Sequence, residues 1–497
     1  MNKLHYILTC VALFLFACFF SCKDDYEDYS TSSNHILSFS TDTLSLDTLL
    51  STVGSSTRKF MIYNKNKKPL LISSIHLSKE NGFRINVDGQ SGYDFSNIHI
   101  GAEDSLYVFV EATLAEASAN TPVYIKDEII FITNNVQQKV ILEASVQNVT
   151  ILKAPVFENS TTLSNERPYL IYDSLVVAEN VTLEIPEGTI FYMMAKTGFK
   201  VYGTVKAIGT LEHPIIFRGS RTDYLLGISY DLVPGQWDGL WFAASSTGNE
   251  FEYVHIRNGM YAINLESSNP DIQKLSIKNS VLTNANGHLL YAENCNIIAE
   301  NSEFSNASGA LAYLTGGQYN FAQCTFANYL PSWVGITTTG NTIILSNYTL
   351  DNEGNPVAAP LYSANFQNSI VYGSSTTNAQ YIIRQNKEKL PDTAMDYLFQ
   401  NCLLLKKDGK NDGDTLVNCI FNENPEFIKS KPVKSGQEGI PESQKEYDYV
   451  FDFRISSESP ARNKADISIA QEYPFDMNGI YRFQDEGPDM GAYEYAE

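Results

Sequence analysis

A short phrase, made of a small polar pair followed by an apolar strand, recurs in the second half of the chain. Successive copies begin 22, 22 and 45 residues apart, and two irregular steps follow. The copies are Asn279-Ser280, Asn301-Ser302, Gln323-Cys324, Asn368-Ser369, Asn401-Cys402 and Asn418-Cys419. This period is too short for helical-pair repeats and lacks the leucine pattern of leucine-rich repeats, but it matches the length of one rung of a parallel β-helix.

Each residue type of the phrase has a physical role in such a coil. An Asn at a bend tolerates left-handed backbone, and we expect its side chain to hydrogen-bond to the copies stacked on it. Ser and Cys are small enough to pack where the chain turns inward, so the cysteines after residue 22 are predicted to be small buried hydrophobes. About a dozen rungs at a strand spacing of about 4.8 Å would give a rod on the order of 60 Å long.

Phrases upstream of the repeat extend the same pattern. They are residues 176–190, residues 199–210 and Trp237-Asp238-Gly239-Leu240. In combination with the repeat they resemble right-handed parallel β-helix proteins of the pectin-lyase-like superfamily, over residues 156–460. Residues 461–497 resemble the closing segment of such bacterial β-helices, although Asn463 stands where an acid is commoner. We predict that this tail caps the exposed edge of the last rung.

Short strands separated by turn signals fill residues 36–150 and predict an all-β sandwich. The stretch 56–72 resembles immunoglobulin-like domains of bacterial surface proteins. No cysteine lies between Cys22 and Cys295, so the disulfide of antibody-type domains is absent. The predicted fold class is therefore all-β, an N-terminal β-sandwich followed by a right-handed parallel β-helix. The sandwich would serve either as a spacer or docking platform, or as a binding module.

The first 22 residues read as a signal peptide. Lys3 precedes an apolar run of about 15 residues, which is short for a bilayer-spanning helix. Cys22 directly after this run resembles the lipidated cysteine of a bacterial lipobox, and the charges that follow it resemble the export signal of surface lipoproteins. The resemblance implies a protein held at the outer membrane, exposed on the cell surface, by acyl chains on Cys22, with residues 23–35 as a linker. Cys18 is a competing lipidation site, and an ordinary secretory signal is the alternative.

Charge and composition limit the partners. Asp and Glu outnumber Lys and Arg by 57 to 35, for a net charge of −22, which argues against nucleic-acid binding. The histidines are scattered, and neither a Cys-x-x-Cys pair nor a phosphate-binding loop occurs. We therefore predict no metal site, no cofactor and no nucleic-acid partner, and nothing in the sequence points to a particular oligomeric state.

Catalytic motifs are sparse. The Asp clusters and the Gly-His-Gly motif of β-helix hydrolases are missing. Arg257 or Lys278 could act as the base of a lyase, but no dense acid cluster accompanies either. Asp271 and Glu266 are isolated and read as solvated bend residues. No catalytic residue is assigned, and a polysaccharide lyase or glycoside hydrolase is kept as the alternative to a non-enzymatic binding protein.

The rung between Arg218 and Trp241 is interrupted by a long insertion, where binding surfaces of repeat proteins are often built. Aromatic and acidic residues in and beside it could stack on and hydrogen-bond to a sugar. We predict a glycan-contact site made by Tyr224, Tyr230, Trp237 and Asp238. The alternative is that Trp237 and Trp241 pack against the first rungs as a lid. The sequence therefore predicts a non-enzymatic, membrane-anchored rod that binds a glycan or a surface protein.

Overall fold

The computed structural model describes residues 28–79, 81–225, 228–331, 338–374, 380–406, 408–431, 433–434, 447–448 and 450–496. The predicted signal peptide, Cys18, Cys22 and the first part of the linker lie outside these residues. The chain divides into two compact units after Asn148. Among the described residues, no helix has both the length and the apolar character needed to span a membrane.

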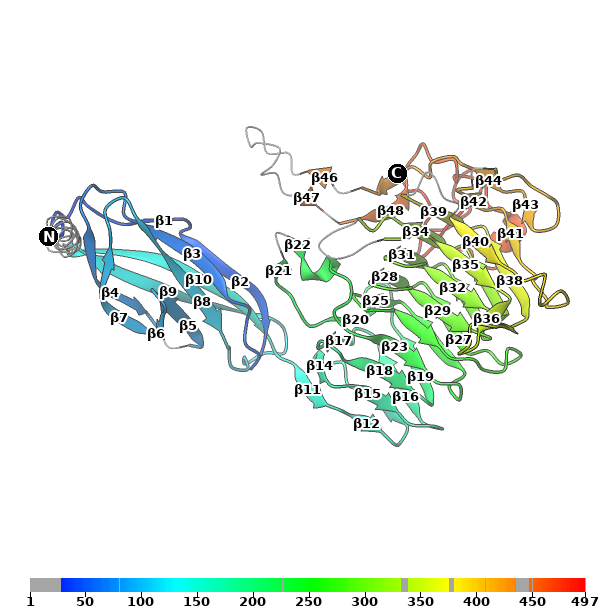
Figure 1. Cartoon of the computed structure of the whole chain (residues 1–497), viewed down its shortest axis with the longest axis horizontal. Helices are drawn as coiled ribbons and strands as arrows, with labels where there is room; N and C mark the ends of the chain where they lie inside the picture. Colours follow the sequence, from blue (N-terminus) through cyan, green and yellow to red (C-terminus); the bar gives the residue numbers. More distant parts are fainter. Residues whose placement is uncertain are drawn as a thin grey trace, which may run out of the picture. The chain divides into compact units, whose positions relative to one another are not determined.

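The first unit is a sandwich of two five-stranded sheets (Figure 1). One sheet has the order β1-β3-β8-β5-β6, formed by Ser38–Phe39, Arg58–Tyr63, Ser105–Ala112, Phe83–Val87 and Gln90–Gly92. The other has the order β2-β10-β9-β4-β7, formed by Thr43–Leu50, Val136–Gln147, Val123–Thr133, Leu70–Leu77 and Asp94–Ile100. Pairing is antiparallel except between β10 and β2. The predicted sandwich is confirmed, and its likeness to immunoglobulin-like domains stays a prediction.

Alternation along the sandwich strands decides which side chains enter its core. In β9, buried and less buried residues alternate from Asp127 to Thr133, so that Ile129 and Phe131 point inward. Phe131 meets Phe60 of the other sheet edge to face, with ring centroids 6.3 Å apart. Period-two burial of this kind fixes the register, because a slip by one residue would turn every apolar side chain outward.

The second unit is a parallel β-helix whose rungs contribute strands to three long parallel sheets (Figure 1). The 11-stranded sheet holds β11 Thr150–Lys153, β14 Tyr169–Tyr172, β17 Ile190–Met193, β20 Ile215–Gly219, β25 Val254–Arg257, β28 Val281–Ala285, β31 Glu303–Ala307, β34 Thr325–Asn328, β39 Ile370–Gly373, β42 Leu403–Leu404 and β44 Ile420–Phe421. The nine-stranded sheet holds β12 Val156–Phe157, β15 Leu175–Val177, β18 Gly198–Val201, β23 Gly239–Phe242, β26 Ile263–Leu265, β29 Leu290–Glu293, β32 Ala312–Thr315, β35 Ile343–Ser346 and β40 Tyr381–Arg384. The ten-stranded sheet holds β13 Thr161–Thr162, β16 Thr182–Pro186, β19 Thr204–Ile208, β24 Asn249–Glu252, β27 Leu275–Lys278, β30 Asn296–Glu300, β33 Gly317–Ala322, β38 Leu361–Gln367, β41 Leu398–Gln400 and β43 Leu416–Val417.

Smaller elements decorate the coil. The insertion after β20 forms the hairpin β21–β22 (Tyr224–Leu225, Ile228–Ser229) and the 3-10 turn η2 (Tyr230–Leu232). Antiparallel pairs form between β36 and β37 (Tyr348–Leu350, Pro356–Ala358), β45 and β48 (Phe427–Lys429, Asp452–Ile455), and β46 and β47 (Val433–Lys434, Tyr447–Asp448). A short helix, α2, spans Ile467–Ala470. The predicted fold class is confirmed.

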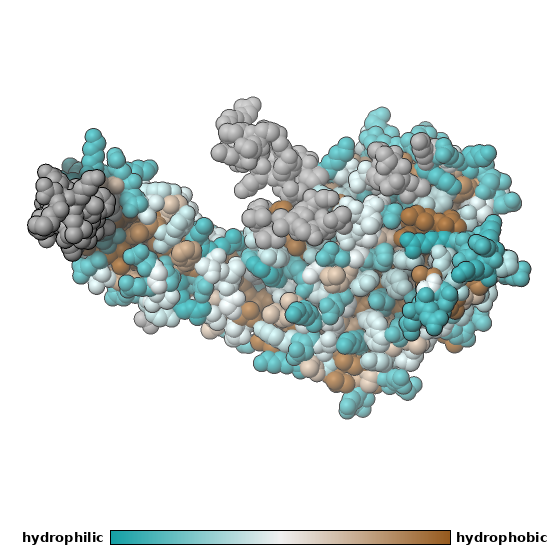
Figure 2. Space-filling view, in the orientation of Figure 1, coloured by the Kyte–Doolittle hydropathy of each residue, from teal (hydrophilic) through white to brown (hydrophobic). Residues whose placement is uncertain are grey.

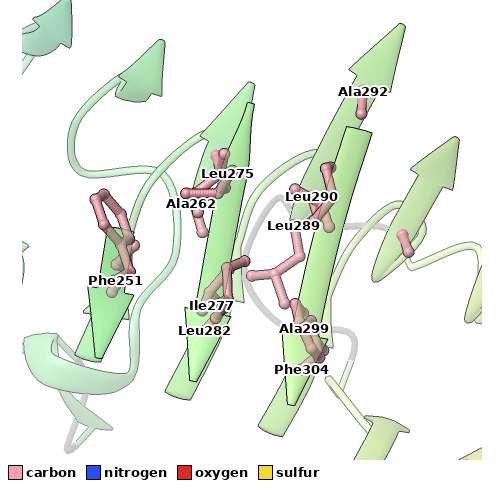
Figure 3. Packing of buried hydrophobic residues seen from close by; sticks show 14 of the residues in the cluster. Phe251, Ala262, Leu275, Ile277, Leu282, Leu289, Leu290, Ala292, Ala299 and Phe304 are labelled. Carbon is pink, nitrogen blue, oxygen red and sulfur yellow. The ribbon is translucent and has the colours of Figure 1, made fainter. Parts of the chain in front are cut away.

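Stacked apolar side chains fill the coil from rung to rung. Phe191 and Phe217 stack with centroids 4.7 Å apart, and so do Phe304 and Phe326. Figure 3 shows buried aliphatic side chains of β27, β28 and β29, which belong to one rung and contribute one strand to each long sheet. Each fully buried side chain of this size contributes about 1.5–3 kcal/mol, so the interior stabilises the coil without any disulfide. The face of the molecule in Figure 2 carries mostly hydrophilic and intermediate residues, with several hydrophobic patches between them.

The repeated phrase lies at the bend between the ten-stranded and 11-stranded sheets. Its first residues adopt positive φ, from 45° to 54° at Asn301, Gln323 and Asn368, as predicted. The Ser and Cys positions link rungs, since the amide of Ser280 donates to Ser302 Oγ at 3.2 Å. The cysteines that follow the sandwich are all buried and unpaired, as predicted; they are Cys295, Cys324, Cys402 and Cys419.

The C-terminal segment, residues 461–496, contacts the side of the coil over β28, β31 and β34. Ala461, Ala465 and Met490 also share a hydrophobic cluster with Leu403 of β42 and Ile420 of β44, and the predicted cap over the last rung stays a prediction. Two Asn side chains of the phrase bond to this segment, whereas hydrogen bonds to the stacked copies were predicted. Asn301 Nδ2 donates to the Phe475 carbonyl at 2.9 Å, and Asn368 Nδ2 donates to the Asp466 carbonyl at 3.0 Å. The reason is geometric, because the amides at this bend face outward and a polar tail can reach them.

Candidate binding surface on the β-helix

The four residues predicted to contact a glycan do not form one site. Tyr224 is 49% exposed on the hairpin of the insertion, and Tyr230 begins η2, where its hydroxyl accepts from Arg221 Nη1 at 2.8 Å. Trp237 is 1% exposed within the core, and its Nε1 donates to the Arg257 carbonyl at 2.9 Å. Asp238 is exposed.

The prediction is therefore wrong for Trp237, which packs inward as the lid alternative expected. A bridge to Gly259 continues the strand pairing through Trp237, and this register turns the indole toward the interior. Trp241 differs from the lid alternative, since it is half-buried on the outer side of β23.

Trp241 belongs to a row of outward residues on the nine-stranded sheet. In successive strands, Trp241 pairs with Asn264, Asn264 with Tyr291, and Tyr291 with Tyr313. Parallel strands place such partners about 4.8 Å apart, so the side chains form a continuous row along the coil. A 22-residue step separates Tyr291 from Tyr313, and this spacing was the sequence signal that could have revealed the row.

Further rings widen the row into a surface. Tyr202 meets Trp241 edge to face at 5.4 Å between centroids, and Tyr291 meets Tyr313 at the same separation. The His288 ring lies 4.9 Å from that of Tyr313. We call this surface the aromatic face; it consists of Tyr202, Trp241, Tyr261, His288, Tyr291 and Tyr313, all half-buried.

A groove of about 350 Å³ opens at the end of the aromatic face nearest the first rungs. Trp241, Tyr202 and Tyr261 line it together with the polar side chains of Lys200, Asp238 and Asn264. One predicted residue, Asp238, therefore does lie on a concave surface. This mixture of rings and a few polar groups is typical of small-molecule sites.

Gly239 makes the groove possible. Its φ is +99°, and a Cβ built there would lie 2.2 Å from the carbonyl oxygen of Tyr261. Only glycine avoids both the left-handed strain and this collision. The backbone of β23 can therefore approach the next rung closely, directly beside Asp238 and Trp241.

Hydrogen bonds hold the rings at the other end of the aromatic face. The Tyr291 hydroxyl donates to Glu293 at 2.5 Å, and Arg384 Nη1 donates to the Tyr313 hydroxyl at 2.8 Å. Burial and then the bond to Glu293 raise the pKa of Tyr291. These contacts limit ring rotation, so the face is ordered before any ligand arrives.

His288 is a neutral member of the aromatic face. Its Nδ1 accepts a hydrogen bond from the Ala310 amide at 2.9 Å, which places the proton on Nε2. Burial, and next the charge of Arg384, lower the pKa of His288. The ring therefore acts as a flat, uncharged surface at neutral pH.

Carboxylates also border the face. Leu265 pairs with Ala292, so Glu266 and Glu293, the next residues, follow on neighbouring rungs. Glu266 Oε2 accepts from the Ala244 amide at 3.1 Å. The repeat period did not reveal this neighbour, because 27 residues, and not 22, separate Glu266 from Glu293.

The two residues weighed as a possible base of a lyase lie on other sheets. Arg257, in β25, approaches Asp231 Oδ1 at 2.7 Å, and Lys278, in β27, pairs with Glu300 at 3.1 Å. Both cations are engaged by carboxylates away from the aromatic face. Within the described ranges, no group of His, Cys, Asp and Glu has the arrangement needed to hold a metal ion.

Comparisons with known proteins give only distant likenesses. No family model and no curated protein matches the chain. Among solved structures, the catalytic domain of a GH87 α-1,3-glucanase in complex with nigerose aligns at 11% identity over 74% of this chain and 88% of its own, with a TM-score of 0.19. A family 123 glycoside hydrolase from Clostridium perfringens aligns at 9% identity and a TM-score of 0.17, over 24% of this chain and 26% of its own. The YadV chaperone aligns at 10% identity and a TM-score of 0.16, over 22% of this chain and 51% of its own.

Proposed function

We propose that the protein is a lipid-anchored surface protein of the bacterial outer membrane that binds a glycan chain on the aromatic face without cleaving it. The observation that carries the proposal is the row Trp241, Tyr291 and Tyr313, flanked by Tyr202 and His288. Half-buried rings, of which Tyr291 and Tyr313 are held by hydrogen bonds, offer apolar area at little entropic cost, which suits the C–H faces of sugar rings.

The polar groups beside the rings supply the second half of such recognition. Lys200, Asp238 and Asn264 line the groove next to Trp241 and can hydrogen-bond to sugar hydroxyls. A ligand that extends from this groove toward Tyr313 would cross several rungs. An extended chain of repeating units therefore suits the surface better than a single small molecule.

The binding proposal is tested by a glycan-array screen of the full chain, followed by calorimetry on each hit. We expect Trp241→Ala and Tyr291→Ala each to weaken binding by about tenfold or more, as loss of a central aromatic anchor does. Tyr362→Ala is the matched control, because Tyr362 is 50% exposed on β38 of the ten-stranded sheet. Equal affinity of the Trp241 and Tyr291 variants and the parent protein would refute the proposal.

The anchor has a separate test. Cys22→Ala should release the protein from the membrane fraction and abolish metabolic labelling with palmitate. Cys18→Ala is the matched control and should leave both unchanged. If labelling persists in Cys22→Ala and is lost in Cys18→Ala, the lipid is on Cys18.

Glycoside hydrolysis is the second candidate, favoured by Glu266 and Glu293 on neighbouring rungs beside the aromatic face. A glycosidase uses two carboxyl groups, one as the acid and the other as the nucleophile or base. Chromatography of each bound glycan after incubation with the protein tests this function. If products form, Glu293→Gln should abolish them while binding persists; intact glycan after prolonged incubation rejects the candidate.

A further inference from the structure

We propose that the sandwich carries a second, independent binding site, for a neutral oligosaccharide, on the outer face of the sheet β1-β3-β8-β5-β6. The site is a pocket of about 470 Å³ lined by residues of β5, β6 and β8, by the residue that precedes β3 and by the residue that follows β6. All of them belong to the first unit, so the site does not depend on the aromatic face of the β-helix.

Aromatic rings on this face point into solvent. Tyr93 is 44% exposed, Tyr107 45% and Phe109 37%. Tyr107 and Phe109 alternate with buried residues along β8 and stack on each other with centroids 5.9 Å apart. Strand residues that face water are usually polar, so adjacent exposed rings mark a surface that is covered by a ligand or partner.

The cross-strand register surrounds Phe109 with hydrogen-bonding groups. Phe109 pairs with Lys59 of β3 on one side and with Asn86 of β5 on the other. Asn86 pairs in turn with Ser91 of β6, and its Nδ2 donates to Ser91 Oγ at 2.9 Å. An apolar ring thus lies beside an amide and a hydroxyl in one row across four strands.

The charges in the pocket are balanced. Arg84 pairs with Glu111 at 3.5 Å, and Thr57 Oγ1 donates to the same carboxylate at 2.5 Å. This pair offers donors and an acceptor to hydroxyl groups but no net charge to an ion. Flat rings, an amide, hydroxyls and a balanced ion pair together suit an uncharged sugar ring, with its apolar faces and polar edge.

Volume supports a ligand of a few sugar units. Ligand pockets generally measure about 300–1,000 Å³, and this one lies in that range. Tyr93 and Phe109 are the two aromatic residues that line the pocket.

The test uses the full chain carrying Trp241→Ala and Tyr291→Ala, so that the β-helix surface is already weakened. Isothermal titration with cellohexaose, maltohexaose, laminarihexaose and chitohexaose should show binding of at least one of them. Adding Phe109→Ala should then lower the affinity by about tenfold or more. Phe109→Leu keeps an apolar side chain but removes the flat ring, so its affinity for the hexasaccharide should fall nearly as much as that of Phe109→Ala.

Tyr124→Ala is the matched control, because Tyr124 is 58% exposed on β9 of the opposite sheet. The inference is overturned if none of the four hexasaccharides binds, or if Phe109→Leu binds as tightly as Tyr124→Ala. It is also overturned if sedimentation shows that Phe109→Leu dissociates a dimer, since the rings would then serve contact between two copies. Failure of the β-helix proposal, by contrast, would appear as unchanged binding after Trp241→Ala in the otherwise unaltered chain.

Discussion

Replacing Arg482 by Met should free the C-terminal segment from the side of the coil. The Arg482 side chain is 0% exposed, and that of its partner Glu494 is 1% exposed. Arg482 Nη1 donates to Glu494 at 3.1 Å, and Nη2 donates to Asn301 Oδ1 at 3.0 Å and to the Gly491 carbonyl at 3.1 Å. One guanidinium therefore joins the tail to the amide of a β-helix bend.

The magnitude follows from what remains after the substitution. Without the guanidinium, the buried oxygens of Glu494, Asn301 and Gly491 lose their donor. A buried acceptor left without a donor costs about 1–3 kcal/mol, so at about 1–1.5 kcal/mol each the three come to about 3–5 kcal/mol. Since 1.4 kcal/mol is a factor of ten, opening of the tail should become about 10² to 10³ times more frequent.

Hydrogen–deuterium exchange of the amides in residues 461–496 measures this opening directly. Arg462→Met is the matched control, because Arg462 pairs with Asp485 at the surface, with side chains 27% and 31% exposed. Such a pair contributes about 1 kcal/mol or less. Equal exchange in the Arg482 and Arg462 variants would refute the claim that the buried guanidinium holds the tail.

Three further predictions concern pH, backbone and thiols. Burial, then repulsion from a neighbouring carboxylate, raises the pKa of Glu494 to about 8, so the folded tail keeps a proton that the open tail loses. The folded tail should be most stable below about pH 4.5 and lose stability as the pH rises to about 8. Slower amide exchange in the tail at pH 9 than at pH 5, after correction for intrinsic exchange rates, would contradict this expectation. Gly239→Ala should lower the free energy of unfolding, measured by thermal denaturation, by about 1–3 kcal/mol. Gly248→Ala should lower it less, because a Cβ at residue 248 would meet nothing within 4 Å. Equal losses in the two variants would contradict the role of the close approach between Gly239 and the Tyr261 carbonyl. Burial raises the pKa of Cys295 to about 11 and of Cys324 to about 12, so mass spectrometry should find neither thiol alkylated by iodoacetamide at pH 8 until the protein unfolds.

The fold was predictable because its signal is local and repeated. Asn301 and Asn368 adopt the left-handed backbone that their residue type favours, and the apolar residues after them fill the interior. Each rung repeats the same bend and the same apolar strand, so the weak preference of a single Asn for left-handed backbone is reinforced by the same preference in neighbouring rungs.

The candidate site was predictable only in part, because it depends on register. Trp237 and Trp241 are four residues apart in an interrupted rung, and one faces the core while the other faces water. A strand turns its side chains over at every residue, so an insertion of unknown path hides which tryptophan is outside. Tyr291 and Tyr313 carried a usable signal, but its meaning required knowing that their strands are neighbours.

The placement of the tail has a consequence for how the molecule is made. Tyr493 bonds to Glu303, a residue 190 positions earlier, and Arg482 reaches Asn301 across 181 positions. Contacts this distant in sequence form late, since a long loop must close before they give any stabilisation. During synthesis from the N-terminus, most rungs would therefore wind first, and only the arrival of residues 477–493 would cover the side of the middle rungs.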